Sequence, residues 1–379
     1  MKIVKVEIFP LLIPYKSNFS IARGKVGGGD MKRTVMMVKL TDEDGFVGWG
    51  EGSPSYLWSS ETIETVIATL ENYFIPSIID ADIYDIDEFH SRMEKAIGPA
   101  FSTSHPIAKC ALDTAIHDLK AHRLGVNISE MWGLCRNKEV TLSWTVSADN
   151  LQQAKLIVEE GLSQGYQNFN VKLGADPILD VQLCHYIKKM VPNGFLWGDA
   201  NGGYTFNEAT KYISSLEDAG LDLLEQPFSS NDWSNWKRFK NFASIPIAVD
   251  EAIVSPKDLM EWIKQDLITA FTTKVTRNGG LYPSFQCAII AQQANLLILS
   301  SGLTETGLGL ATNLHLACAF GIDLPCAWNG PQFLGDDILT KPLNIEAGRI
   351  QLPSGPGIGV EVDEEKVRFL SRDFWDNGR

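Results

Sequence analysis

The chain has 379 residues, of which 44% are hydrophobic and 21% charged, with 32 glycines and 17 prolines. This composition excludes a disordered, collagen-like or coiled-coil protein, and the length suits a barrel of about 250 residues with a second domain of about 130. The formal net charge is −14. Such a surface repels phosphate backbones, so we expect no nucleic-acid partner.

The six cysteines form no Cys-x-x-Cys pair, and most of them stand in apolar stretches, as is typical of small core residues. The N-terminal segment carries Glu7 and Pro10 where a signal peptide needs an unbroken apolar run. No apolar window of about 18 residues is present to cross a membrane. We therefore expect a cytoplasmic protein without a membrane partner.

The first third of the chain has strand patterns followed by helix patterns. Residues 1–13 and 34–51 alternate apolar and polar side chains, and helical spacing follows in 59–74 and in 105–125. Runs of strands and then of helices indicate an α+β unit, which we assign to residues 1–130.

From about Thr141 onward, short apolar runs alternate with helical stretches. The runs end at Val146, Lys172, Asp199, Glu225, Asp250, Lys274, Ser300 and Trp328. Between Lys172 and Lys274 the steps are about 25 residues long, which fits one strand plus one helix. Eight such steps close a (β/α)₈ barrel, which we assign to residues 131–340. The alternative, an open doubly wound sheet, usually has a glycine-rich turn after its first strand, and this sequence has none.

Five charged residues end successive predicted strands: Lys172, Asp199, Glu225, Asp250 and Lys274. In a barrel these strand ends form the face that carries the active site. Three carboxylates gathered there repel one another unless a cation binds them, and oxygen ligands favour Mg²⁺ or Mn²⁺ over zinc. The two lysines belong to strands on opposite sides of the barrel and can face each other. Single charges at strand ends are often turn residues, but the regular spacing of all five argues against that alternative.

Two segments resemble the signatures of the mandelate racemase/muconate lactonizing enzymes of the enolase superfamily. Residues 107–125 resemble the first signature. The second spans 196–227, with Asp199-Ala-Asn201, Ala209, Leu216 and Leu224-Glu225-Gln226-Pro227 at the family's spacing. The resemblance covers essentially the whole chain. It implies an α/β fold, a modified TIM barrel with an N-terminal α+β capping domain that is completed by a C-terminal segment, residues 341–379.

The resemblance also implies roles for the charged residues. Asp199, Glu225 and Asp250 match the three metal ligands, and Lys172 and Lys274 match the two lysines of the muconate lactonizing subgroup. The shared chemistry is removal of the proton beside a carboxylate by a lysine, while Mg²⁺ stabilises the resulting enediolate. No histidine ends strand 7, so the mandelate racemase subgroup does not fit. We expect Asn201 and Glu251 beside the metal ligands.

Several residues depart from the family pattern. Asn170 replaces the first lysine of a Lys-x-Lys motif, so the metal, burial or a cation on the substrate must lower the pKa of Lys172 instead. Tyr56 and Trp58 lie in the loop expected over the barrel mouth, and Trp328 ends strand 8. Aromatic rings of this kind bind ammonium groups, although such a lid can also merely exclude water.

The segment 327–343 is similar to the strand-8 region of muconate cycloisomerases, but Ala327 stands where they have a glutamate. The Asp-x-Asp of dipeptide epimerases is also missing. Glu305, on the strand-7 loop, is either a partner of Lys274 or a substrate contact.

We interpret the protein as an Mg²⁺-dependent racemase or epimerase of a small carboxylate, an N-modified amino acid such as a proline betaine. Asn170, Tyr56, Trp58 and Trp328 are the predicted substrate contacts. The alternatives are a muconate-type cycloisomerase, a dehydratase such as hydroxyproline dehydratase, and a non-catalytic barrel, which would not need all five charged residues. We expect a homo-oligomer.

Overall fold

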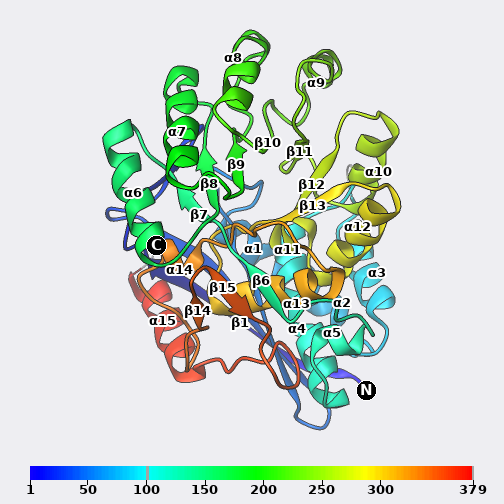
Figure 1. Ribbon diagram of the computed structural model, residues 1–379. Helices are drawn as coiled ribbons and strands as arrows, with labels where there is room; N and C mark the ends of the chain where they lie inside the picture. Colours follow the sequence, from blue (N-terminus) through cyan, green and yellow to red (C-terminus); the bar gives the residue numbers. More distant parts are fainter. Residues whose placement is uncertain (100–101, 378–379) are drawn as a thin grey trace.

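The computed structural model describes residues 1–99 and 102–377. Figure 1 shows an N-terminal sheet with helices, a ring of parallel strands with outer helices, and a tail that returns toward the N-terminal part. The boundaries at residues 130 and 340 stay a prediction. Within the described ranges, no helix has both the length and the apolar character to span a membrane.

The N-terminal part is built on a three-stranded antiparallel sheet whose order is β1–β4–β5. These strands are β1 (Ile3–Pro14), β4 (Lys32–Asp42) and β5 (Val47–Gly52). Helix α4 (Pro106–Leu124) lies against β5 because alternate residues of that strand are glycines. A Cβ on Gly50 would lie 2.1 Å from the carbonyl oxygen of Ala111, so a larger residue there would push the helix away.

A short hairpin and further helices complete this part. They are β2 (Phe19–Ile21), β3 (Gly24–Gly27), α1 (Ile63–Thr69), a π-helical segment η1 (Leu70–Phe74), α2 (Ile75–Ile78), α3 (Ile86–Ala96) and α5 (Ile128–Met131). The helix predicted over 59–74 begins later, at Ile63, because Thr62 caps it by accepting the backbone N–H of Thr65.

The second part is a curled sheet of parallel strands with helices outside it. In the described chain its order is β13–β12–β11–β10–β9–β8–β7. The strands are β7 (Trp144–Val146), β8 (Phe169–Lys172), β9 (Leu196–Asp199), β10 (Leu223–Glu225), β11 (Ile247–Val249), β12 (Ala270–Thr273) and β13 (Leu297–Ser300).

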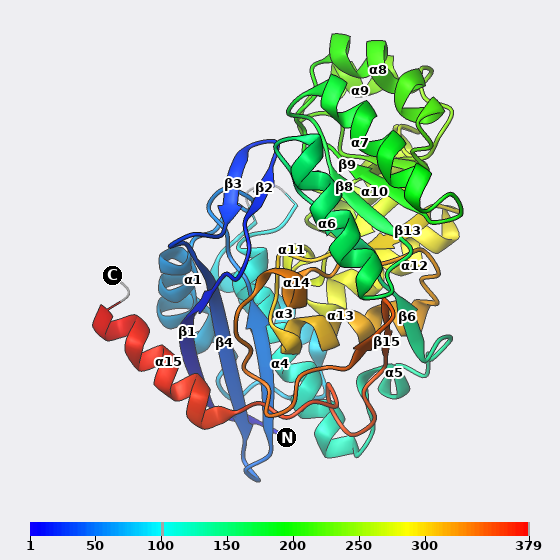
Figure 2. The ribbon, with the colours of Figure 1, turned by 60° about the vertical axis from the view of Figure 1, so that its left-hand side comes forward.

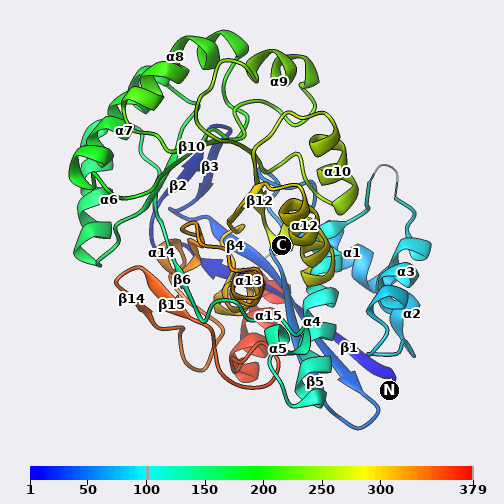
Figure 3. The same cartoon turned by 45° about the vertical axis from the view of Figure 1, so that its right-hand side comes forward.

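Helices follow most of these strands, and Figure 3 shows α6 to α10 as an outer arc around the sheet. The helices are α6 (Leu151–Ser163), α7 (Pro177–Met190), α8 (Phe206–Asp218), α9 (Trp233–Phe239), α10 (Pro256–Lys264), α11 (Val275–Asn278), α12 (Leu281–Gln293), α13 (Gly307–Phe320) and α14 (Gly330–Phe333). The fold is a modified TIM barrel with an added α+β domain, as expected.

The eighth strand that the sequence predicted is reduced to two bridges. Cys326 pairs with Leu142 and Ala327 with Ser301, each in parallel fashion, and these pairs join the two edges of the sheet. Pro325 precedes them and has no N–H to donate, which limits the length of the ladder. Trp328 therefore follows a closing contact of the barrel and does not end a regular strand.

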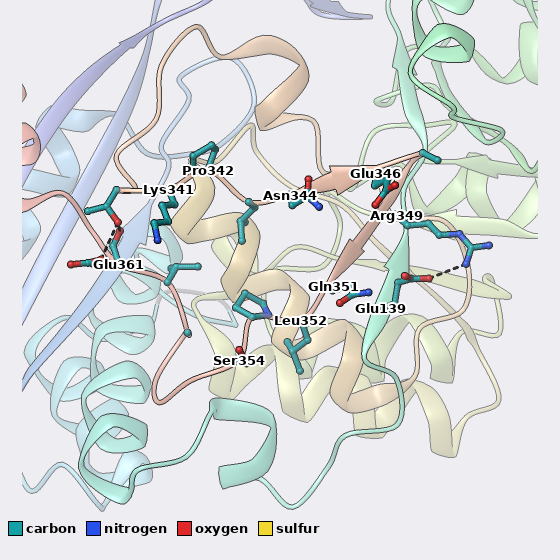
Figure 4. A pocket seen from close by; sticks show the side chains of 16 residues that line it. Glu139, Lys341, Pro342, Asn344, Glu346, Arg349, Gln351, Leu352, Ser354 and Glu361 are labelled. Atoms are coloured by element: carbon teal, nitrogen blue, oxygen red, sulfur yellow. Dashed lines mark hydrogen bonds and ion pairs between the residues drawn. The ribbon is translucent and has the colours of Figure 1, made fainter.

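The tail contacts both preceding parts. Strand β15 (Arg349–Gln351) pairs with β14 (Ile345–Glu346) and with β6 (Glu139–Thr141), and helix α15 (Glu364–Asn377) lies along β1 (Figure 2). A pocket of about 720 Å³ is lined by Glu139 of β6 and by the tail. Figure 4 shows the side chains that line it, with the Glu139–Arg349 ion pair at one side. None of the site residues predicted from the sequence lines this pocket.

Candidate active site

The carboxyl ends of five neighbouring strands carry the five charged residues. Lys172, Asp199 and Glu225 end β8, β9 and β10, and Asp250 and Lys274 directly follow β11 and β12. The parallel register places Lys172 beside Asp199, and Asp199 beside Glu225. All five side chains are buried. The structure therefore brings together the residues that the sequence placed in one site.

Each lysine is paired with a different carboxylate. Lys172 Nζ lies 2.7 Å from Asp199 Oδ2, and Lys274 Nζ lies 2.5 Å from Asp250 Oδ2. Burial alone would lower the pKa of Lys172, but the negative charges of Asp199 and Glu225 outweigh burial and hold that pKa above its ordinary value. The two amines thus flank the carboxylate cluster from opposite sides.

One aromatic ring covers both lysines. Trp58 is 6% exposed, and its ring centroid lies 5.7 Å from Lys172 Nζ and 4.9 Å from Lys274 Nζ. Phe19, from β2, packs edge-on against Trp58 at 5.5 Å and stacks on Phe333 at 4.5 Å. The N-terminal domain and the barrel together form a roof that keeps bulk water from the amines.

Of the three predicted metal ligands, Glu225 is the one that forms no ion pair with another described residue. Its Oε2 accepts the indole N–H of Trp197 at 2.6 Å, and its buried Oε1 has no hydrogen-bond partner. Burial, and then the charges of Asp199 and Asp250, raise the pKa of Glu225 well above its ordinary value. A buried oxygen in this electrostatic setting favours a bound cation.

Asp250 carries the largest share of positive contacts, and one of them was missed from the sequence. Arg277 forms an ion pair with Asp250 Oδ1, and Lys274 binds Oδ2. Burial acts in the opposite direction, but Arg277 and Lys274 hold the pKa of Asp250 below its usual range. Arg277 stands three residues after Lys274, one helical turn along, and this spacing was the available signal. Phe19 had no such signal because only the tertiary fold places β2 over the barrel.

Asn201 and Glu251, which we expect beside the metal ligands, lie close to the carboxylates. Asn201 donates its backbone N–H to Asp199 at 2.9 Å and its side-chain amide to Glu251 at 2.8 Å. Burial, and then the charge of Asp250, raise the pKa of Glu251. Glu305 accepts the hydroxyl of Thr276 at 3.0 Å, so it contacts α11 and not Lys274 itself.

The four predicted substrate contacts occupy different surroundings. Trp58 lies over the lysines, whereas Tyr56 is 68% exposed. Trp328 is buried and donates its indole N–H to Ser300 at 3.1 Å. Asn170 lies below Lys172 on the same strand, and its side-chain oxygen is buried without a partner. Their roles in substrate binding stay predictions.

The donor set suits a divalent cation that prefers oxygen. As the side chains lie, no group of three His, Cys, Asp or Glu residues in the described ranges is arranged to hold a metal ion, because the carboxylates of Asp199 and Asp250 are turned toward their cationic partners. Glu225 Oε1 and Asn201 Oδ1 are nevertheless buried and unpartnered. These oxygens fit Mg²⁺ or Mn²⁺ in donor chemistry.

Two family models match most of the chain. Residues 4–133 match the mandelate racemase/muconate lactonizing enzyme N-terminal domain, and residues 152–366 match the enolase C-terminal domain-like family. The chain belongs to this family. A chloromuconate cycloisomerase from Pseudomonas putida is 30% identical to this family member over 98% of the chain and all of the relative.

Solved structures agree with the assignment. The 2-chloromuconate cycloisomerase of Rhodococcus opacus 1CP has a TM-score of 0.90 and 26% identity over 98% of this family member and all of that chain. A dipeptide epimerase from Cytophaga hutchinsonii, solved with Mg and a dipeptide, shares the fold with a TM-score of 0.90 at 22% identity, over 97% of this chain and 98% of that one. This family member is an isomerase of the enolase superfamily.

Proposed function

We propose that the protein is a racemase or epimerase that removes the α-proton of a carboxylate substrate and returns it on the opposite face. The observation that carries this proposal is the pair of buried lysines under one tryptophan. Lys172 and Lys274 approach from strands β8 and β12, with the carboxylates of β9 to β11 between them. A base on each face is what inversion at one carbon requires.

Asp199, Glu225 and Asp250 would hold the metal ion, which we propose is Mg²⁺ with Mn²⁺ as a substitute. When bound, the ion supplies positive charge to the substrate carboxylate and so acidifies the neighbouring C–H bond. Trp58 and Phe19 exclude water from the amines, which strengthens each electrostatic contact inside the site. One lysine Nζ accepts the proton, and the other Nζ, still protonated, donates one to the opposite face.

Charge balance supports a substrate without net charge. Four carboxylates, those of Asp199, Glu225, Asp250 and Glu251, interact with three cations, Lys172, Lys274 and Arg277. A divalent ion brings the formal sum to one positive charge, and one neutral lysine acting as base brings it to zero. An amino acid whose nitrogen is cationic keeps this buried site neutral, whereas a dicarboxylate adds two negative charges. Amino acids whose nitrogen remains cationic, such as N-methylated amino acids and proline betaines, have the favoured charge.

A muconate-type cycloisomerase is the second candidate. It is favoured by the relatives, because the chloromuconate cycloisomerase from Pseudomonas putida is 30% identical over 98% of the chain. That reaction needs only one lysine for proton transfer, and the other serves as a cation. Ala327, where the resemblance leads us to expect a glutamate, lies in the apolar layer beneath the site and supplies no polar group.

The lysine variants distinguish the two candidates. We expect Lys172→Ala and Lys274→Ala each to abolish racemisation, while one of them still exchanges the α-proton of one enantiomer with solvent. Lys188→Ala is the matched control, because Lys188 is paired with Asp222 outside the site at 2.7 Å. Chiral chromatography measures racemisation, and mass spectrometry measures exchange of the α-proton with solvent. Racemisation at the normal rate in either site variant contradicts the two-base mechanism.

A further inference from the structure

Trp197 occupies the interior of the barrel directly below the carboxylates. Its side chain is fully buried, and its apolar layer consists of Leu223, Ala248, Ala270, Leu299 and Ala327. Three of these five neighbours are alanines, so the layer has room for one indole and no second large ring. The strand register places Trp197 opposite Leu223, two residues before Glu225 on the same face of β10.

The indole makes one polar contact, and it is to Glu225. An indole N–H is a donor only, and a buried one needs an acceptor. Trp197 Nε1 donates to Glu225 Oε2 at 2.6 Å, which is shorter than the usual N–H···O separation of about 2.9 Å. In the described chain, Glu225 differs here from Asp199, which has a lysine on one oxygen, and from Asp250, which has a cation on each oxygen.

We infer that Trp197 is a positioning residue that orients Glu225 for metal binding: it holds Oε2 and leaves Oε1 free for the ion. This inference rests on the proposed function. Because the donor is neutral, it fixes the carboxylate without cancelling the charge that attracts a cation. The packed alanine layer fixes the indole in turn, so the orientation is built into the barrel interior.

Metal affinity tests the inference without a known substrate. Trp197→Phe keeps a ring in the barrel and removes the N–H. We expect it to weaken Mn²⁺ binding, measured by electron paramagnetic resonance of the free ion, by about 10- to 100-fold, as is usual when a partner of a metal ligand is lost. Trp236→Phe is the matched control, because its buried indole donates to the backbone oxygen of Ser229 away from the site. An affinity within twofold of the wild type in Trp197→Phe overturns the inference.

If Trp197→Phe does not fold, NMR spectroscopy tests the hydrogen bond between Trp197 and Glu225 directly. In protein labelled with ¹⁵N at the indole nitrogens, we expect one N–H resonance far downfield that shifts upfield in Glu225→Gln and moves when Mg²⁺ is added to the wild type. Identical indole spectra of the wild type and Glu225→Gln contradict the contact. A wild type that binds no Mn²⁺ overturns the proposed metal site and this inference with it, whereas normal binding that is insensitive to Trp197 overturns the inference alone.

Discussion

At the scale of single residues, the cationic side chains of the site are shared unevenly among its three predicted metal ligands. Asp250 has a cation on each oxygen, Asp199 has one, and Glu225 has none. A cation at Glu225 would therefore meet the least competition from the protein's own amines, and we expect removal of that carboxylate charge to lower metal affinity the most.

We expect Glu225→Gln to keep the fold and to lose activity, because the amide keeps the shape of the side chain and removes its charge. Circular dichroism checks the fold, and turnover with and without EDTA checks the metal. Glu261→Gln, at a partly exposed position on α10 outside the site, is the control and should behave like the wild type. Full activity of EDTA-treated wild-type enzyme would show that the metal assignment is wrong.

His315 gives the stability of the protein a pH dependence. It is buried on α13, lies 2.9 Å from the carbonyl oxygen of Ile358, and burial lowers its pKa to about 4. The unfolded chain, with a histidine pKa near 6.5, binds the proton first, so stability falls as pH drops from about 6.5 to about 4. The loss from this residue is about 2 kcal/mol at pH 5.

Urea unfolding at pH 7 and at pH 5 measures how much unfolding free energy the protein loses through His315. We expect the difference in unfolding free energy between the two pH values to shrink in His315→Gln and to stay unchanged in His185→Gln, whose side chain is exposed on α7. An equal pH response of the wild type and His315→Gln would refute the assignment.

At the scale of elements, helix α12 depends on the neighbouring domain for its N-terminal cap. Asp113, on α4, accepts the backbone N–H groups of Leu281 and Tyr282, and it also lies 2.6 Å from His90 Nε2. Helix α12 follows α11 after two glycines, and Lys274 is the residue directly before α11. The cap thus links the N-terminal domain to the segment that carries a proposed catalytic lysine.

We expect Asp113→Ala to lower the unfolding free energy by about 3 kcal/mol, because it leaves buried donors unpaired. Asp87→Ala, which removes only an exposed contact to the Tyr282 hydroxyl, should cost less than about 0.5 kcal/mol. Urea unfolding of both variants provides the comparison. Similar losses in the two would mean that the cap contributes little.

At the scale of the whole molecule, the site is assembled from both domains. Glu51, at the end of β5, accepts the backbone N–H groups of Thr306 and Gly309 at the start of α13. Arg33 donates to Pro54 in the N-terminal domain and to Thr304 in the barrel. These buried contacts hold the loop that carries Trp58 against the barrel mouth.

The sequence predicted what is encoded locally. The charges after apolar runs located Lys172 and Asp250 because strand ends in a barrel share one face. It could not predict the roof made by Phe19, which depends on how the two domains meet. Nor did it predict Arg277 as a partner of Asp250, because that contact joins helix α11 to the residue after β11, and only the tertiary fold brings the two together. The exposure of Tyr56 likewise follows from loop packing, which periodicity does not reveal.

The most direct test of the central claim is incubation of the enzyme and Mg²⁺ in D₂O with single enantiomers of N-modified amino acids and with muconate. We expect deuterium at the α-carbon of an N-modified amino acid together with loss of its optical purity, detected by mass spectrometry and chiral chromatography. Conversion of muconate to a lactone, with no exchange in any betaine or proline derivative, would contradict the account and assign the protein to the cycloisomerases.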